Sequence, residues 1–91
     1  MVIVKYMVNC PLCNKKHDGE IAMFYRKDNK FNVRMNNKNT HTCGNCSKEF
    51  IVEIDSYGNV TATPKNIENG IYPWEKISEG KIVEIIEHSN N

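Results

Sequence analysis

The sequence predicts a small, mainly β protein: an antiparallel sheet followed by a segment that can form a C-terminal helix. Its 91 residues are 40% hydrophobic and 25% charged, which suits one small core and excludes a fully disordered chain. Apolar and polar residues alternate along several short segments, as in strands with one buried face. Four cysteines form two Cys-x-x-Cys pairs, a pattern that suits a metal site. We expect one domain over residues 1–91, with the core sheet in 1–63 and an extension in 64–91.

A first strand is expected over residues 2–8, because the even-numbered positions of this segment are all valine or tyrosine and would share one face. The polar segment 14–19, behind the first cysteine pair, is expected to be a turn. Residues 21–26 and 31–36 alternate again and are expected to pair as a β-hairpin. A three-residue loop over residues 28–30 would place apolar side chains opposite one another in this hairpin.

This register gives the hairpin two different faces. The face toward the core is expected to carry Ile21, Met23, Tyr25, Phe31, Val33 and Met35. The outer face is expected to be basic and to expose an aromatic ring. It carries Phe24, Arg26, Asn32, Arg34 and Asn36.

The second half of the core sheet follows a polar connection over residues 36–40 and the second cysteine pair. A strand is expected over residues 49–55, where apolar residues occupy every second position. Residues 56–59 are expected to turn the chain into a further strand over 60–63. Pro64 is expected to end the pairing, because proline has no N–H to donate to the sheet.

The C-terminal segment is open to two interpretations. Ser78 can cap a helix over residues 79–88, in which three isoleucines have helical spacing. Gly80 weakens this helix, and the same residues can form a strand. Either element is expected to cover the sheet, since a sheet this small needs a partner on its open face.

The cysteines are the expected centre of chemistry. A Cys-x-x-Cys turn points two sulfurs at one spot, and two such turns can form the tetrahedral sulfur site that zinc prefers. Disulfides are the alternative. A structural Zn²⁺ contributes on the order of 10 kcal/mol to folding, which is comparable with the net stability of a whole domain. The expected ligands are Cys10, Cys13, Cys43 and Cys46.

Two histidines lie near the cysteine pairs in the sequence. His17 comes four residues after Cys13, and His41 comes two residues before Cys43. Because four thiolates already complete a zinc site, we expect both histidines to be solvated or to support the ligands from outside.

The Cys-Pro-Leu-Cys and Cys-Gly-Asn-Cys segments, together with the strand over residues 49–55, resemble the paired knuckles of zinc-ribbon domains. The resemblance covers residues 8–55 and implies a zinc ion at one end of a small antiparallel sheet. Many zinc ribbons have glycine after the second cysteine of a knuckle, where this chain has Asn14 and Ser47. The spacing of 29 residues between the pairs is also similar to that of rubredoxins, so an iron electron carrier is a further alternative.

Charge is distributed unevenly along the chain. Residues 1–48 carry nine Lys/Arg against three Asp/Glu, and residues 49–91 carry three against eight. Cations beside an exposed aromatic ring can neutralise phosphates and stack on a base, as single-stranded nucleic acid requires. The alternative is a solvated, lysine-rich face. The expected nucleic-acid contacts are Phe24, Arg26, Lys27, Lys30, Arg34 and Lys38.

These observations favour a non-enzymatic zinc-binding module that binds nucleic acid or a protein of the transcription machinery. No carboxylate pair, catalytic triad or phosphate-binding loop stands out in the sequence. An alternative is a small phage or prophage protein that binds or inhibits a host protein, since 13 Asn, 10 Ile and 10 Lys against 2 Arg indicate A/T-rich codons. No segment reads as a membrane span or a cleavable leader, so we expect a cytoplasmic, reducing location.

Overall fold

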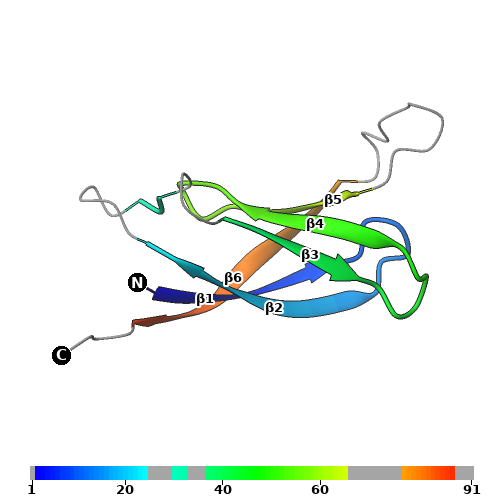
Figure 1. The fold of residues 1–91 in the computed structure, drawn as a ribbon, viewed down its shortest axis with the longest axis horizontal. Helices are drawn as coiled ribbons and strands as arrows, with labels where there is room; N and C mark the ends of the chain where they lie inside the picture. The colour runs from blue at the N-terminus through cyan, green and yellow to red at the C-terminus, as the bar shows by residue number, and fades with distance from the viewer. Residues whose placement is uncertain (1, 25–29, 33–36, 66–76, 88–91) are drawn as a thin grey trace.

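A computed structural model describes residues 2–24, 30–32, 37–65 and 77–87, which form an antiparallel all-β fold (Figure 1). The strands join in one sheet in the order β2-β1-β6-β5-β4-β3. This confirms the expected small, mainly β architecture. The strands of the described residues are β1 (Val2–Asn9), β2 (Lys16–Met23), β3 (Lys38–Thr42), β4 (Glu49–Ile54), β5 (Val60–Pro64) and β6 (Ser78–Glu87).

The sheet curls into a nearly closed barrel, in which the edge strands β2 and β3 approach one another (Figure 1). Side chains join these edges. The Asn39 side-chain amide donates to the Glu20 carbonyl oxygen at 3.4 Å and to the Tyr6 hydroxyl at 3.2 Å. The Tyr6 hydroxyl also forms a hydrogen bond of 2.5 Å with His41 Nε2. The first and second halves of the sheet are therefore tied together on this side by polar side chains.

The core is formed by every second residue of the strands. Burial alternates along the whole of β1, and it alternates in the same way along β4 and β5. The predicted strands over residues 2–8 and 49–55 are thus confirmed. Each buried side chain of this kind stabilises the fold by about 2 kcal/mol. The largest of them, among the described residues, are Tyr6, Phe50, Met23 and Ile54.

Two segments that the sequence analysis assigned to connections are strands. Lys16–Met23 is β2 and pairs with β1, so the expected turn over residues 14–19 was wrong beyond its first residues. Lys38–Thr42 is β3 and pairs with β4, so the expected connection over residues 36–40 was also wrong. Both are edge strands, which commonly carry polar side chains that discourage pairing with other chains. Their polarity therefore made them look like loops.

The expected hairpin over residues 21–26 and 31–36 lies partly outside the described residues. Ile21 and Met23 are buried as predicted, but they belong to β2 and pair with β1. Phe31 is buried too, and its backbone N–H donates to the Ser56 carbonyl oxygen at 3.0 Å. The proposed loop register, with the facing positions of Tyr25, Val33 and Met35, falls on residues that are not described.

Of the two interpretations of the C-terminal segment, the helix was wrong and the strand is confirmed, because residues 78–87 form β6. This strand lies between β1 and β5, pairing with β5 through residues 78–80 and with β1 through residues 81–87. It is thus part of the sheet and does not cover it (Figure 1). No helix in the described part of the chain is long and apolar enough to cross a membrane.

A β-bulge explains the misleading helical spacing of the isoleucines. The register shifts between Lys5 and Tyr6, so that Tyr6 pairs with Ile82 while Val4 pairs with Ile85. The inserted residue of β6 places Ile82 and Ile85, the partners of the buried Tyr6 and Val4, three residues apart. Ile82 packs against the core, whereas Ile85 is 40% exposed. The strand β5 ends at Pro64 as expected, although Pro64 itself is still paired with Phe50.

Candidate metal centre

The two Cys-x-x-Cys loops have the same backbone conformation. In the β1–β2 loop, Cys10 N–H donates to the Lys15 carbonyl oxygen at 2.8 Å, and Asn14 N–H donates to the Cys10 carbonyl oxygen at 2.9 Å. The β3–β4 loop repeats this pattern, with Cys43 N–H donating to Lys48 at 2.9 Å and Ser47 N–H to Cys43 at 2.8 Å. Each loop is therefore a closed turn that fixes the direction of its two sulfurs.

The residue after each cysteine pair has a left-handed backbone. The φ angle is 68° at Asn14 and 62° at Ser47. Asparagine adopts this conformation several times more readily than most residues, and glycine most readily of all. Both positions, where zinc ribbons often have glycine, therefore adopt in this chain the left-handed backbone that glycine favours.

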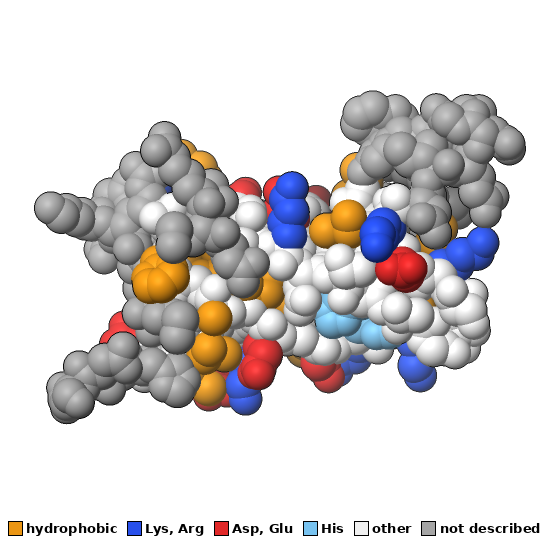
Figure 2. All heavy atoms as spheres, in the orientation of Figure 1, with side chains coloured by type: hydrophobic (Ala, Val, Ile, Leu, Met, Phe, Trp, Pro, Cys, Tyr) orange, Lys and Arg blue, Asp and Glu red, His pale blue; other side chains and the backbone are white. Residues whose placement is uncertain are grey.

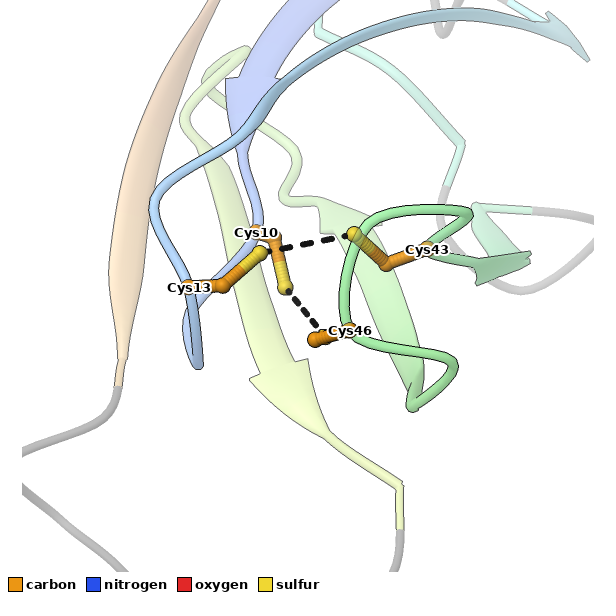
Figure 3. Close-up of side chains that lie close together, drawn as sticks. All are labelled: Cys10, Cys13, Cys43 and Cys46. Atoms are coloured by element: carbon orange, nitrogen blue, oxygen red, sulfur yellow. Dashed lines mark hydrogen bonds between the residues drawn. The ribbon is translucent and has the colours of Figure 1, made fainter.

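The four cysteine side chains point toward one common centre from the two loops (Figure 3). All four sulfurs lie within 4.8 Å of one another. Cys10 Sγ is 3.8 Å from Cys46 Sγ, and Cys13 Sγ is 3.5 Å from Cys43 Sγ. A tetrahedral ion with metal–sulfur bonds of about 2.3 Å requires sulfurs roughly 3.8 Å apart, whereas a disulfide needs about 2.0 Å. The four free cysteines can hold a metal ion.

The thiols differ in their tendency to ionise. Burial raises the pKa of Cys10, while a hydrogen bond from the Asn45 side chain lowers the pKa of Cys13 to about 6. At Cys46 the Lys48 backbone N–H lowers the pKa, but burial and the neighbouring cysteines outweigh it and raise the pKa to about 11. Four adjacent thiolates repel one another, so a divalent cation would supply the charge that lets all four ionise.

The donor set is open to more than one metal. Tetrahedral coordination by four sulfurs suits zinc, and it equally suits iron. Cys10 and Cys43 are buried, whereas Cys13 and Cys46 are half-buried, so one side of the site faces the surface of the molecule. What the geometry establishes is a four-sulfur cluster in a small β fold.

The histidines form a separate cluster with aromatic neighbours. His41 stacks on Phe50 at 5.3 Å between ring centroids, and His17 packs edge-on against the same ring at 5.1 Å. Burial lowers the pKa of His41. Gly19 makes room for this arrangement, because a Cβ there would lie only 2.4 Å from the Tyr6 hydroxyl oxygen. Within the described residues the metal-ligand cluster contains cysteines alone.

The sequence did not predict the hydrogen bonds that join β1 to β3 through polar side chains. The missed residues are Tyr6, Asn39 and His41, which come from β1 and β3 and meet where the barrel closes. The segment around His41 is entirely polar, so no alternation of apolar and polar residues indicated a strand there. The histidine side chains of the described part are visible on one face of the molecule (Figure 2).

The expected nucleic-acid contacts are only partly placed. Phe24 is exposed, with 40% of its surface accessible. Lys30 Nζ lies 4.7 Å from the centroid of the Tyr57 ring, and Lys38 Nζ lies 3.7 Å from a carboxylate oxygen of Glu53. The other three expected contacts, Arg26, Lys27 and Arg34, lie outside the described residues.

No family model matches the chain, and comparison with curated proteins and with solved structures gave no match. The molecule is therefore characterised by its own geometry. It is a small antiparallel β protein with a cluster of four cysteines that can hold a metal ion.

Proposed function

We propose that this chain is a zinc-stabilised, non-catalytic module of a reducing compartment such as the cytoplasm, and that it binds nucleic acid. The observation that carries the zinc assignment is the convergence of four cysteine sulfurs within 4.8 Å. Four protein ligands leave no open position for water or substrate, so the ion would be structural. The basic segment between the two cysteine pairs supports zinc over iron, because rubredoxins are acidic proteins.

Metal analysis of the purified protein tests the zinc assignment. We expect one zinc per chain and a colourless preparation, even from medium rich in iron. Replacing a ligand, as in Cys43→Ser, should abolish stoichiometric zinc, whereas Ser47→Ala next to the site should retain it. One iron per chain with a red colour would instead favour the rubredoxin-like electron carrier, and disulfide-bonded cysteines without metal would overturn both assignments.

The binding of nucleic acid is supported by the basic first half of the chain and by the exposed ring of Phe24. We expect the double variant Arg26→Ala/Arg34→Ala to bind single-stranded oligonucleotides more weakly than wild type at low salt. The variant Lys65→Ala/Lys81→Ala is the matched control, because it removes the same charge from two exposed lysines elsewhere. Absence of wild-type binding at low salt would contradict this part of the proposal.

A second candidate function is the phage-type module that binds a host protein. It is favoured by apolar residues exposed on and beside β6, namely Ile77, Val83 and Ile85. Exposed apolar residues on a small protein often belong to protein interfaces. A stoichiometric protein partner that stays bound after nuclease treatment, and that is lost in Val83→Asp, would favour this function over the first.

A further inference from the structure

The turn between β4 and β5 exposes an aromatic ring at the end of the sheet away from the cysteines. Tyr57 is 74% exposed, more than any other large hydrophobic side chain of the described residues. In Figure 1 this turn lies at the left-hand end, whereas both cysteine loops lie toward the right-hand end. Turns favour small polar residues for conformational reasons, so an exposed tyrosine at the tip of this one calls for another explanation.

The Tyr57 ring is carried on a rigid backbone. Asp55 Oδ1 accepts the backbone N–H groups of Tyr57 and Asn59, both at 2.9 Å, and Asp55 Oδ2 accepts the Asn59 side-chain amide at 2.8 Å. Asp55 N–H also donates to the Asn59 carbonyl oxygen at 3.0 Å, and Gly58 has a φ of 89°. Binding to a turn that is already ordered avoids the entropic cost of ordering it.

A second aromatic ring and a cation lie at the same end of the molecule. The Lys30 ammonium lies 4.7 Å from the Tyr57 ring centroid, a distance typical of a cation–π contact. Phe24 is connected to the turn through the backbone, because Asn32 N–H donates to the Phe24 carbonyl at 2.7 Å and Phe31 N–H donates to Ser56. Figure 2 shows hydrophobic side chains reaching the surface at this end. We call Phe24, Lys30 and Tyr57 the Tyr57 platform.

We propose that the Tyr57 platform binds unpaired bases of single-stranded nucleic acid by stacking. This inference rests on the proposed function and adds to it the binding site and the form of the nucleic acid. Every base has a π-face that can stack on an aromatic ring, and an adjacent ammonium can neutralise the phosphate that follows the base. In a duplex these faces are covered by the neighbouring bases, so the platform selects single strands. A purely apolar protein partner would make no use of the cation.

Fluorescence anisotropy with a labelled oligothymidylate of about 15 nucleotides, the upper range for one small binding module, tests the proposal. We expect Tyr57→Ala to weaken binding by at least about fivefold, since loss of one stacked base has this effect or more. Tyr57→Phe should bind like wild type because it keeps the ring. Lys30→Ala should reduce the slope of log affinity against log salt by about 0.7, the value for one phosphate on a single strand.

Matched controls separate the platform from general effects of charge and apolar surface. Lys65→Ala removes one charge directly after the other end of β5, and Val83→Ala shortens an exposed apolar side chain on β6. Both are expected to leave the affinity unchanged. Zinc content and the NMR spectrum of each variant verify that it is folded. Wild-type affinity in Tyr57→Ala, or tighter binding of the duplex than of the single strand, would overturn the platform.

The experiments distinguish an error in the platform proposal from an error in the proposed function. If Tyr57→Ala binds like wild type while Arg26→Ala/Arg34→Ala does not bind, the chain binds nucleic acid by another surface and only the platform is wrong. If the wild-type protein binds no oligonucleotide, both are wrong. If the wild-type protein binds no oligonucleotide but binds a protein partner that Tyr57→Ala no longer binds, the platform is a protein-binding site and the inference is overturned.

Discussion

Gly80 lets β6 pack tightly against the end of β1. A Cβ at this position would lie 2.3 Å from the Met7 carbonyl oxygen and 2.9 Å from Val8 Cβ. The clashing oxygen belongs to the backbone of the neighbouring strand, so it cannot move aside without separating the two strands. Gly80, which in the sequence looked like a weak point in a helix, is therefore required by the packing of the sheet.

We predict that Gly80→Ala lowers the free energy of unfolding by about 1–3 kcal/mol, the range for overpacking a tight site. Gly44→Ala is the matched control, because no atom lies within 4 Å of its added Cβ, and its effect should stay below about 0.5 kcal/mol. Urea unfolding of the metal-loaded protein measures both. Equal effects of the two substitutions would show that β1 and β6 are not this close.

The candidate metal ligands could be predicted from single residues, since two Cys-x-x-Cys pairs suffice to identify them. The resemblance to zinc ribbons also drew attention to Asn14 and Ser47, where glycine is usual, and both residues have a left-handed backbone in the structure. Tyr57 could not be identified in this way. Its exposure depends on the turn and on the nearby segment with Lys30, which is far from it in the sequence.

At the scale of secondary structure, the sequence predicted those strands in which burial alternates with apolar residues, namely β1, β4 and β5. It failed for the edge strand β3 and for the first part of β2, because their polar side chains carry no hydrophobic period, whereas residues 21–23 at the end of β2 were predicted to be strand. It also failed for β6, where the bulge opposite Lys5 and Tyr6 changes the period. The pairing of β6 with the distant β1 is not encoded in local alternation.

The turn between β4 and β5 gives a prediction about pH. Burial of the Asp55 carboxyl raises its pKa, but hydrogen bonds from Asn59, Tyr57 and Gly58 outweigh this effect and lower the pKa overall. Because its pKa is lowered in the folded state, the ionised carboxyl stabilises the protein at pH values above the pKa that the same aspartate has in the unfolded chain. This contribution is lost as pH falls through the folded-state pKa.

We predict that Asp55→Ala lowers the free energy of unfolding at neutral pH by about 1 kcal/mol, as expected for lost hydrogen bonds at an exposed turn. The difference from wild type should shrink below about pH 4, where the aspartate of the unfolded chain takes up its proton. Asp55→Asn, which does not titrate, is the control and should lack this pH dependence. A wild-type carboxyl that titrates at or above the ordinary value in an NMR titration would contradict the assignment.

At the scale of the whole molecule, two connections add to the polar contacts between β1, β2 and β3 in holding the halves of the sheet together. β6 pairs with both β1 and β5, so it joins the halves through backbone hydrogen bonds. The cysteine cluster joins the β1–β2 loop to the β3–β4 loop, which have 29 residues between Cys13 and Cys43. A metal ion bound there would cross-link the same halves at one end of the barrel, where the free sulfurs alone attract one another little.

The most direct test is removal of the metal, followed by a two-dimensional NMR spectrum of the backbone amides. On the order of 10 kcal/mol of folding free energy is attributed to a structural zinc, about as much as a small domain has in total. We therefore predict that a strong chelator collapses the dispersed spectrum and that one equivalent of zinc restores it. A spectrum that stays dispersed after elemental analysis has shown the protein to be free of metal would contradict the account.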